Sequence, residues 1–145
     1  MGKKNIGIAM KIANAGSWCY DHHLKICSKV FYALNYIVFG CVIPPSVKIG
    51  KGTEIAHSIG VVMNHTAVVG ENCHILHNVT LGGVKVIIGN NVLLGTGCVI
   101  QGPCKIGDNV KIGANTFVNF DVPDGATVVG CKGRIILKAN NEVKD

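Results

Sequence analysis

Residues 88–118, IGNNVLLGTGCVIQGPCKIGDNVKIGANTFV, repeat with a period of six, because an aliphatic residue opens each six and glycine often follows it. The pattern extends back to Ile43, with a two-residue slip before Met63 and a one-residue slip before Ile88. All 13 openings are Ile, Leu, Val or Met: Ile43, Ile49, Ile55, Met63, Val69, Ile75, Leu81, Ile88, Leu94, Ile100, Ile106, Ile112 and Val118. A period of six fits neither an amphipathic helix nor a hairpin strand. It is typical of a parallel β-helix, in which each six forms one short strand and its turn.

The fifth position of each six predicts a second inward column, because it is small or branched. Its members are Val47, Thr53, Ile59, Ala67, Cys73, Val79, Val92, Cys98, Cys104, Val110, Thr116 and Val122. Lys85 breaks the column just before the one-residue slip, where a bulge is expected. If three sixes form one coil, residues 18 apart, corrected for the slips, lie above one another at the spacing of paired strands.

Composition indicates a single domain with an unusual charge balance. The chain has 145 residues and a net charge of +6, but its lysines are scattered and few aromatics lie among them. That distribution argues against nucleic-acid binding and favours a basic pocket for a phosphorylated cofactor. The seven cysteines form no CxxC pair, and Cys73, Cys98 and Cys104 fall in the inward column. A reducing, cytoplasmic location is expected, because Lys11 also interrupts the only apolar run near the start.

The chain divides into an N-terminal helical segment (1–40), the hexapeptide β-helix (41–137) and a polar tail (138–145). We expect a short helix that Gly16 ends, then a second helix with Ser17 as its N-cap and Gly40 at its end. The second helix carries one apolar stripe: Tyr20, Leu24, Cys27, Phe31, Leu34 and Val38. The stripe is expected to pack on the end of the β-helix or on a partner subunit, with weak membrane-surface contact as the alternative.

Histidines supply the candidate chemistry, since four of the six lie between residues 57 and 77. His57 falls in the two-residue slip among small residues. Adding 18 residues for one coil and two for the slip leads from position 57 to position 77, which is also a histidine. His57 and His77 are therefore expected to be vertical neighbours. His65 is a weaker candidate, whereas His22, His23 and the corner residue His74 are expected to be ordinary surface histidines.

The stretch 49–62, IGKGTEIAHSIGVV, resembles the active-site coil of the serine acetyltransferase family, which also includes short O-acetyltransferases of surface polysaccharides. The segments NVTLGG (78–83), IGAN (112–115) and DVP (121–123) continue the match in order. The segment VGCKGRI (129–135) is similar to the closing segment of the family, with Lys132 and Gly133 where proline and alanine are usual.

This resemblance implies a left-handed parallel β-helix, an exception to the usual right-handed crossover. It also implies a homotrimer with acetyl-CoA in clefts between subunits, and no metal. His57 takes the position of the catalytic base, which removes the proton of an acceptor hydroxyl during direct attack on the thioester. His77 or a backbone N–H would stabilise the oxyanion.

The resemblance also implies where the cofactor binds. Thr96, Gly97, Ala114 and Asn115 match coils whose backbone lines the pantetheine arm. Lys132 and Arg134 are expected to meet the nucleotide phosphates. Each of these residues is equally explained as an ordinary corner or surface residue.

Two departures from the family bear on the acceptor. Ala56 stands where serine acetyltransferases have an aspartate that would hold the amino group of serine. The long loop after the Gly-Gly pair is also missing. A sugar hydroxyl of a surface glycan or its precursor is therefore the first expectation, and serine the second.

Two interpretations from other classes remain open. The γ-class carbonic anhydrases share the repeat and bind zinc through a GHxxxxH pair, but the comparable stretch here, GTGCVIQ (95–101), lacks both histidines. The chain could also be an inactive binding solenoid, as Ala56 and the missing loop would permit.

Overall fold

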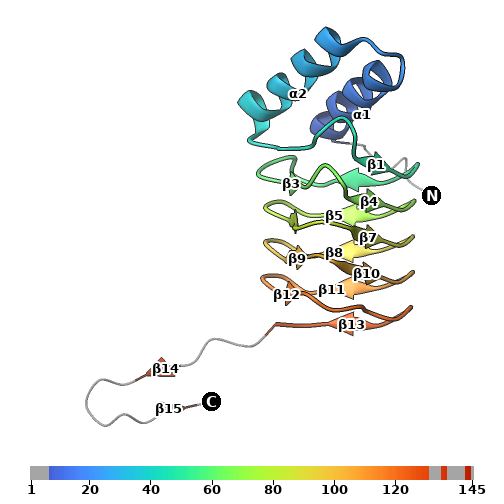
Figure 1. Ribbon diagram of the computed structural model, residues 1–145. Coiled ribbons are helices and arrows are strands. Elements are labelled where there is room, and N and C mark those ends of the chain that lie inside the picture. Colours follow the sequence, from blue (N-terminus) through green and yellow to red (C-terminus); the bar gives the residue numbers. More distant parts are fainter. Residues whose placement is uncertain (1–6, 131–134, 137–142, 145) are drawn as a thin grey trace, which may run out of the picture.

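A computed structural model describes residues 7–130, 135–136 and 143–144 of the chain. Two helices, α1 (Ile8–Asp21) and α2 (Lys25–Phe39), lie over one end of a solenoid of short strands. Strand β13 marks the opposite end (Figure 1). The predicted parallel β-helix is confirmed, and it is preceded by a helix pair.

The solenoid has three walls, each a sheet of parallel strands that come from successive coils. One wall has the order β1-β4-β7-β10, the second β13-β11-β8-β5-β2 and the third β12-β9-β6-β3. The strands are β1 (Lys48–Ile49), β2 (Glu54–Ile55), β3 (Val62–Met63), β4 (Val68–Val69), β5 (His74–Ile75), β6 (Thr80–Gly82), β7 (Val86–Ile88), β8 (Leu93–Leu94), β9 (Val99–Gln101), β10 (Cys104–Ile106), β11 (Lys111–Ile112), β12 (Phe117–Val118) and β13 (Thr127–Val128). Beyond them, β14 (Ile135–Ile136) pairs antiparallel with β15 (Val143–Lys144).

The two columns predicted from the repeat form the core. Twelve of the 13 openings are at most 4% exposed, and Ile49 is half-buried against them. In the fifth-position column the prediction for Ile59 is wrong, because Ile59 is 60% exposed and Val61 fills its place in the core. Cys73, Cys98 and Cys104 are buried in the core, as predicted.

Both slips in the repeat are outward bulges with left-handed backbone. The two-residue slip contains His57 and Gly60, whose φ angles are 58° and 67°. The one-residue slip contains Gly83 and Lys85, at 68° and 57°. The slips therefore lengthen two corners without interrupting the strand ladders on either side.

The predicted boundary between the helices is wrong. Helix α1 continues through Gly16 and Ser17 as far as Asp21, and the chain turns instead at His23, where φ is 60°. Gly16 instead allows α1 and α2 to pack closely, because a Cβ there would lie 3.2 Å from the Cβ of Phe31 on α2. Gly40 ends α2 in the left-handed conformation, as predicted.

The apolar stripe predicted for the second helix is not buried within this chain. Leu24, Leu34 and Val38 are 45%, 41% and 56% exposed, and only Phe31 is half-buried among the stripe residues of α2. The inward face of α2 carries Ser28 and Asn35 instead. In the part of the chain that the structure describes, no helix has both the length and the apolar character needed to cross a bilayer.

Candidate active site

His57 and Ser58 are the two residues that the slip adds to the first coil. Strands β2 and β5 pair Ile55 with Ile75, and β3 and β6 pair Val62 with Thr80, so the corner after β2 is two residues longer than the corner stacked on it. The backbone N–H of Asn78 donates to the carbonyl of Ile59 (3.0 Å), which restores the ladder after the insertion. His57 thus stands outside the wall, and its side chain is exposed.

The helix pair supports this bulge from above. The N–H of Gly60 donates to the carbonyl of Phe39, the last residue of α2, at 3.1 Å. Gly7, at the start of α1, lies so close to Ser58 and Ile55 that a Cβ there would collide with both. Ser58 Oγ also donates to the Ile55 carbonyl at 3.4 Å. The corner that carries His57 is therefore held by both helices.

His57 and His77 are neighbours, as the repeat arithmetic predicted. Their ring centroids lie 5.8 Å apart and the rings meet edge to face at 83°. His77 Nδ1 is buried and has no hydrogen-bond partner among the residues that the structure describes. A buried polar atom without a partner is uncommon, and reorientation of the neighbouring His57 ring would supply one.

The predicted cofactor residues continue the same corner through the next two coils. Gly97 donates its N–H to the His77 carbonyl (3.1 Å), and Asn115 donates its N–H to the Thr96 carbonyl (2.8 Å). A Cβ on Gly97 would collide with the Asn115 side chain. Small residues therefore leave the backbone of this strip uncovered by side chains. Ala114 is exposed beside Asn115. The strip suits an extended, flexible chain, such as the pantetheine arm, lying along the corner. The predicted phosphate-binding residues Lys132 and Arg134 lie outside the described residues.

The other histidines lie elsewhere. His65 is on the next corner of the coil, where its carbonyl accepts a hydrogen bond from Ser46 Oγ (3.1 Å). The prediction that His74 occupies a corner is wrong: it lies in β5, and its Nδ1 is 2.5 Å from Oε1 of Glu54. The register pairs these two residues across β2 and β5, so the same coil arithmetic could have placed them side by side.

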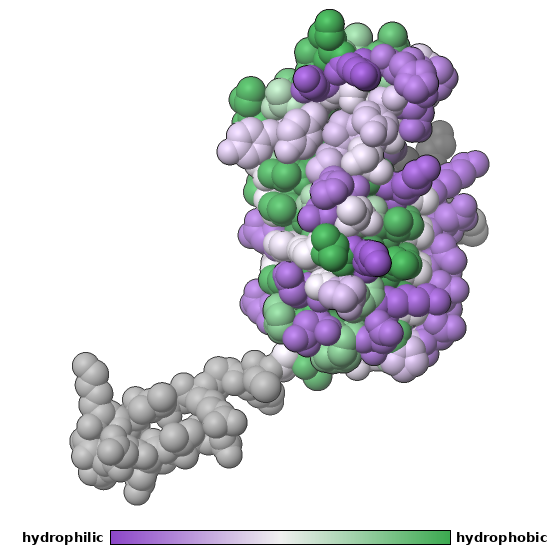
Figure 2. Space-filling view, viewed as in Figure 1, coloured by the Kyte–Doolittle hydropathy of each residue, from purple (hydrophilic) through white to green (hydrophobic). Residues whose placement is uncertain are grey.

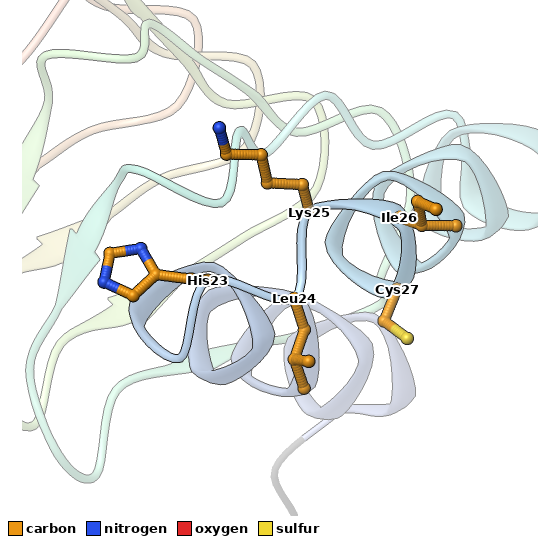
Figure 3. A pocket seen from close by; sticks show the side chains of 5 residues that line it. All are labelled: His23, Leu24, Lys25, Ile26 and Cys27. Atoms are coloured by element: carbon orange, nitrogen blue, oxygen red, sulfur yellow. The ribbon is translucent and has the colours of Figure 1, made fainter.

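A hollow of about 550 Å³ lies at the turn between the helices and includes none of the predicted site residues (Figure 3). It is lined by His23, Leu24, Lys25, Ile26 and Cys27. The candidate site is instead an open corner, as expected if a neighbouring subunit supplies its second side. Across the ranges that the structure describes, no three His, Cys, Asp or Glu side chains gather as a metal-binding group.

A six-residue repeat folded into a three-walled parallel solenoid, with an exposed histidine on a bulged corner, defines the class of hexapeptide-repeat transferases. The sequence profile described as bacterial transferase hexapeptide (six repeats) matches residues 85–119. A serine acetyltransferase of Synechococcus elongatus is 38% identical over 133 residues, which cover 87% of this chain and 54% of that protein.

Solved structures agree with these sequence matches. A Neisseria gonorrhoeae serine acetyltransferase in complex with serine has a TM-score of 0.80 and 37% identity, covering 85% of this chain and 53% of that one. A Brucella abortus serine acetyltransferase in complex with coenzyme A has a TM-score of 0.80 and 33% identity, covering 88% and 54%. The chain belongs to the serine acetyltransferase family, and it spans about half the length of these relatives.

Proposed function

We propose that the chain is an acetyl-CoA-dependent O-acetyltransferase with His57 as its general base. The observation that carries this proposal is the placement of His57, an exposed imidazole lifted from the wall by the family's signature coil and set against His77. Family membership supports the reaction class, and the coenzyme A complex of the Brucella relative supports the donor. A homotrimer, in which the neighbouring subunit closes the open corner, is part of the proposal.

Acetyl-CoA would supply an acetyl group activated as a thioester. His57 accepts the proton of the acceptor hydroxyl as its oxygen bonds to the acetyl carbon, and the imidazolium returns that proton to the departing sulfur. A positioned base of this kind contributes about 10²–10⁴-fold to the rate. His77 lies close enough to orient the His57 ring or to donate to the developing oxyanion.

Serine is the acceptor that the relatives favour. The relatives described above are serine acetyltransferases, and one of them is in complex with serine. This support places serine ahead of the sugar hydroxyl that the sequence alone suggested. A sugar remains the second candidate because Ala56, directly before His57, offers no carboxylate to pair with the ammonium group of serine.

A thiol-release assay with acetyl-CoA, against serine and a panel of sugars, tests the function and the acceptor together. We expect turnover with serine, while turnover with sugars alone would assign the second candidate. The variant Ala56→Asp is informative: if serine is the acceptor, a carboxylate here should lower the KM for serine. Binding of acetyl-CoA by calorimetry with no thiol release from any acceptor would refute the proposal in favour of a binding solenoid.

The base is tested by His57→Asn, expected to lower turnover by at least two orders of magnitude. Asparagine is the appropriate replacement because residue 57 has a φ of 58°, which asparagine tolerates well. His57→Ala should also be inactive, but about 1 kcal/mol less stable than the asparagine variant. Unchanged turnover in a folded His57→Asn trimer would remove His57 from the mechanism.

A further inference from the structure

Helix α2 directs its polar side chains inward and its apolar side chains outward. Ser28 and Asn35 are only 3% and 1% exposed, and Asn35 Nδ2 donates to the carbonyl of Ala9 on α1 at 3.2 Å. Ile26 and Ile37, on the opposite side, are 80% and 78% exposed. This is the reverse of a helix that covers a core, whose apolar side faces the protein.

The outward side chains form a continuous face. The outer face of α2 consists of Ile26, Val30, Ala33, Leu34 and Ile37, whose spacing of four, three, one and three residues places them on one side of a helix. Val30 and Leu34 are 59% and 41% exposed. Figure 2 shows apolar residues at the end of the molecule that carries the helices. Exposed apolar surface of this kind marks an interaction site.

The charged residues that α2 itself places beside this face are both positive, while Asp21 at the end of α1 shares a hollow with Lys25. Lys25 and Lys29 are the only charged residues of α2, and at 100° per residue they lie with Tyr36 along one edge of the outer face. The 550 Å³ hollow adjoins the start of this face, and Lys25 extends from it away from Leu24 and Cys27 (Figure 3). An apolar face with a lysine edge and an aromatic at the boundary is typical of helices that lie in a membrane interface.

We propose that the outer face of α2 binds the surface of an anionic lipid bilayer, with the helix lying in the interfacial plane. The apolar side chains would enter the boundary of the acyl region, and Lys25 and Lys29 would contact anionic headgroups. A second copy of the chain fits less well. Two such faces in contact would place the lysine edges at the rim of the contact, where α2 offers no carboxylate partner for Lys29.

Flotation of the purified full-length protein with lipid vesicles tests this assignment. We expect binding to vesicles with 30% phosphatidylglycerol and at least about fivefold weaker binding to pure phosphatidylcholine, because each lysine adds to attraction by anionic lipid. The double variant Ile26→Ser/Ile37→Ser should lose more than about tenfold in binding. Lys25→Gln/Lys29→Gln should abolish the preference for anionic vesicles while keeping the apolar face.

The matched control is Val129→Ser, because Val129 is 73% exposed next to β13, at the other end of the solenoid. It should bind vesicles as the unmodified protein does. Circular dichroism should show the same helix content in all variants, since every altered side chain points outward. Equal binding by the double isoleucine variant, or no binding at all, would overturn the proposal. So would an assembly larger than a trimer that the double variant dissolves, because the face would then belong to a second copy.

Discussion

His57 occupies the left-handed backbone conformation, which few non-glycine residues adopt. Of the eight non-glycine residues with positive φ in the described part of the chain, five are asparagines: Asn72, Asn78, Asn91, Asn109 and Asn115. Asparagine is the ordinary solution at such corners, because its short side chain tolerates the left-handed region. A histidine held there at a cost of about 1 kcal/mol, beside a second histidine, is the kind of local strain that gathers at functional sites.

His77 is predicted to affect the chemical step more than binding. His77→Gln keeps a polar side chain but removes the imidazole that contacts His57. We expect kcat to fall on the order of tenfold or more, with the KM for acetyl-CoA nearly unchanged. His22→Gln is the control, because His22 stacks on Trp18 at the end of α1. A rise in the KM for acetyl-CoA with kcat unchanged would make His77 a binding residue.

Cys98 is predicted to limit stability at high pH. Burial raises the pKa of this thiol from its ordinary value of 9.0 to about 12. Above pH 9 the unfolded chain loses this proton and the folded chain keeps it, so the free energy of unfolding falls by about 1.4 kcal/mol per pH unit up to pH 12. Denaturant unfolding at pH 8 and 10.5 measures the loss, and Cys98→Ala should show a smaller one. Equal losses in both proteins would contradict the assignment.

At the scale of elements, Gly16 is predicted to set the separation of α1 and α2. A side chain at this position would meet Phe31, because a Cβ added to Gly16 would lie 3.2 Å from the Cβ of Phe31. Gly16→Val should lower the free energy of unfolding by about 1–3 kcal/mol through overpacking. Asn14→Val adds the same branched residue at an exposed position of α1 and should change stability by less than about 0.5 kcal/mol. Similar losses in both variants would show that helix propensity matters more than packing.

The helices were the part that local pattern predicted least well. Gly16 and Ser17 look like a stop and a cap, but glycine serves close helix packing here and the helix continues through both. The strands were predictable because each six carries the same burial requirement. Ile59 failed for a related reason: within an insertion, sequence cannot tell which of the extra residues leave the wall.

At the scale of the whole molecule, the outer surfaces of the walls predict the trimer contact. Val68 and Ile87, in register on β4 and β7, are 41% and 44% exposed, and Phe117 on β12 is 57% exposed. The wall formed by β2, β5, β8 and β11 instead presents Glu54, His74, Leu93 and Lys111. The wall of β3, β6, β9 and β12, and the apolar middle of the first wall between the exposed Lys48 and Lys105, are therefore expected to pack against neighbouring subunits.

Sedimentation should give a mass three times the chain mass of 15.3 kDa. Ile87→Asp should produce monomers, since it would bury a charge in the contact. Lys111→Asp, on the polar wall, should leave the trimer intact. A trimer that survives Ile87→Asp, or one that Lys111→Asp dissociates, would assign the contact to a different wall.

The repeat and the coil arithmetic were sufficient to predict the fold and to bring His57 and His77 together. They could not predict that the helices support the corner of His57. The contacts of Gly7 with Ser58 and of Phe39 with Gly60 join segments that have no common period. The same arithmetic can place Glu54 beside His74, but the contact between them also depends on side-chain orientation. Neither the repeat nor the coil arithmetic predicts the identity of the acceptor, because its recognition depends on groups outside the repeat.

The two-residue insertion is an irregularity of the repeat, and it carries the residue that we propose as the catalytic base. A designer who averaged its coils into one ideal consensus unit would delete positions 57 and 58 first, since they are what the other coils lack. The product should fold readily, and its wall would be smooth. It would also have lost the imidazole that we propose as the base, so stabilisation by consensus should spare this corner.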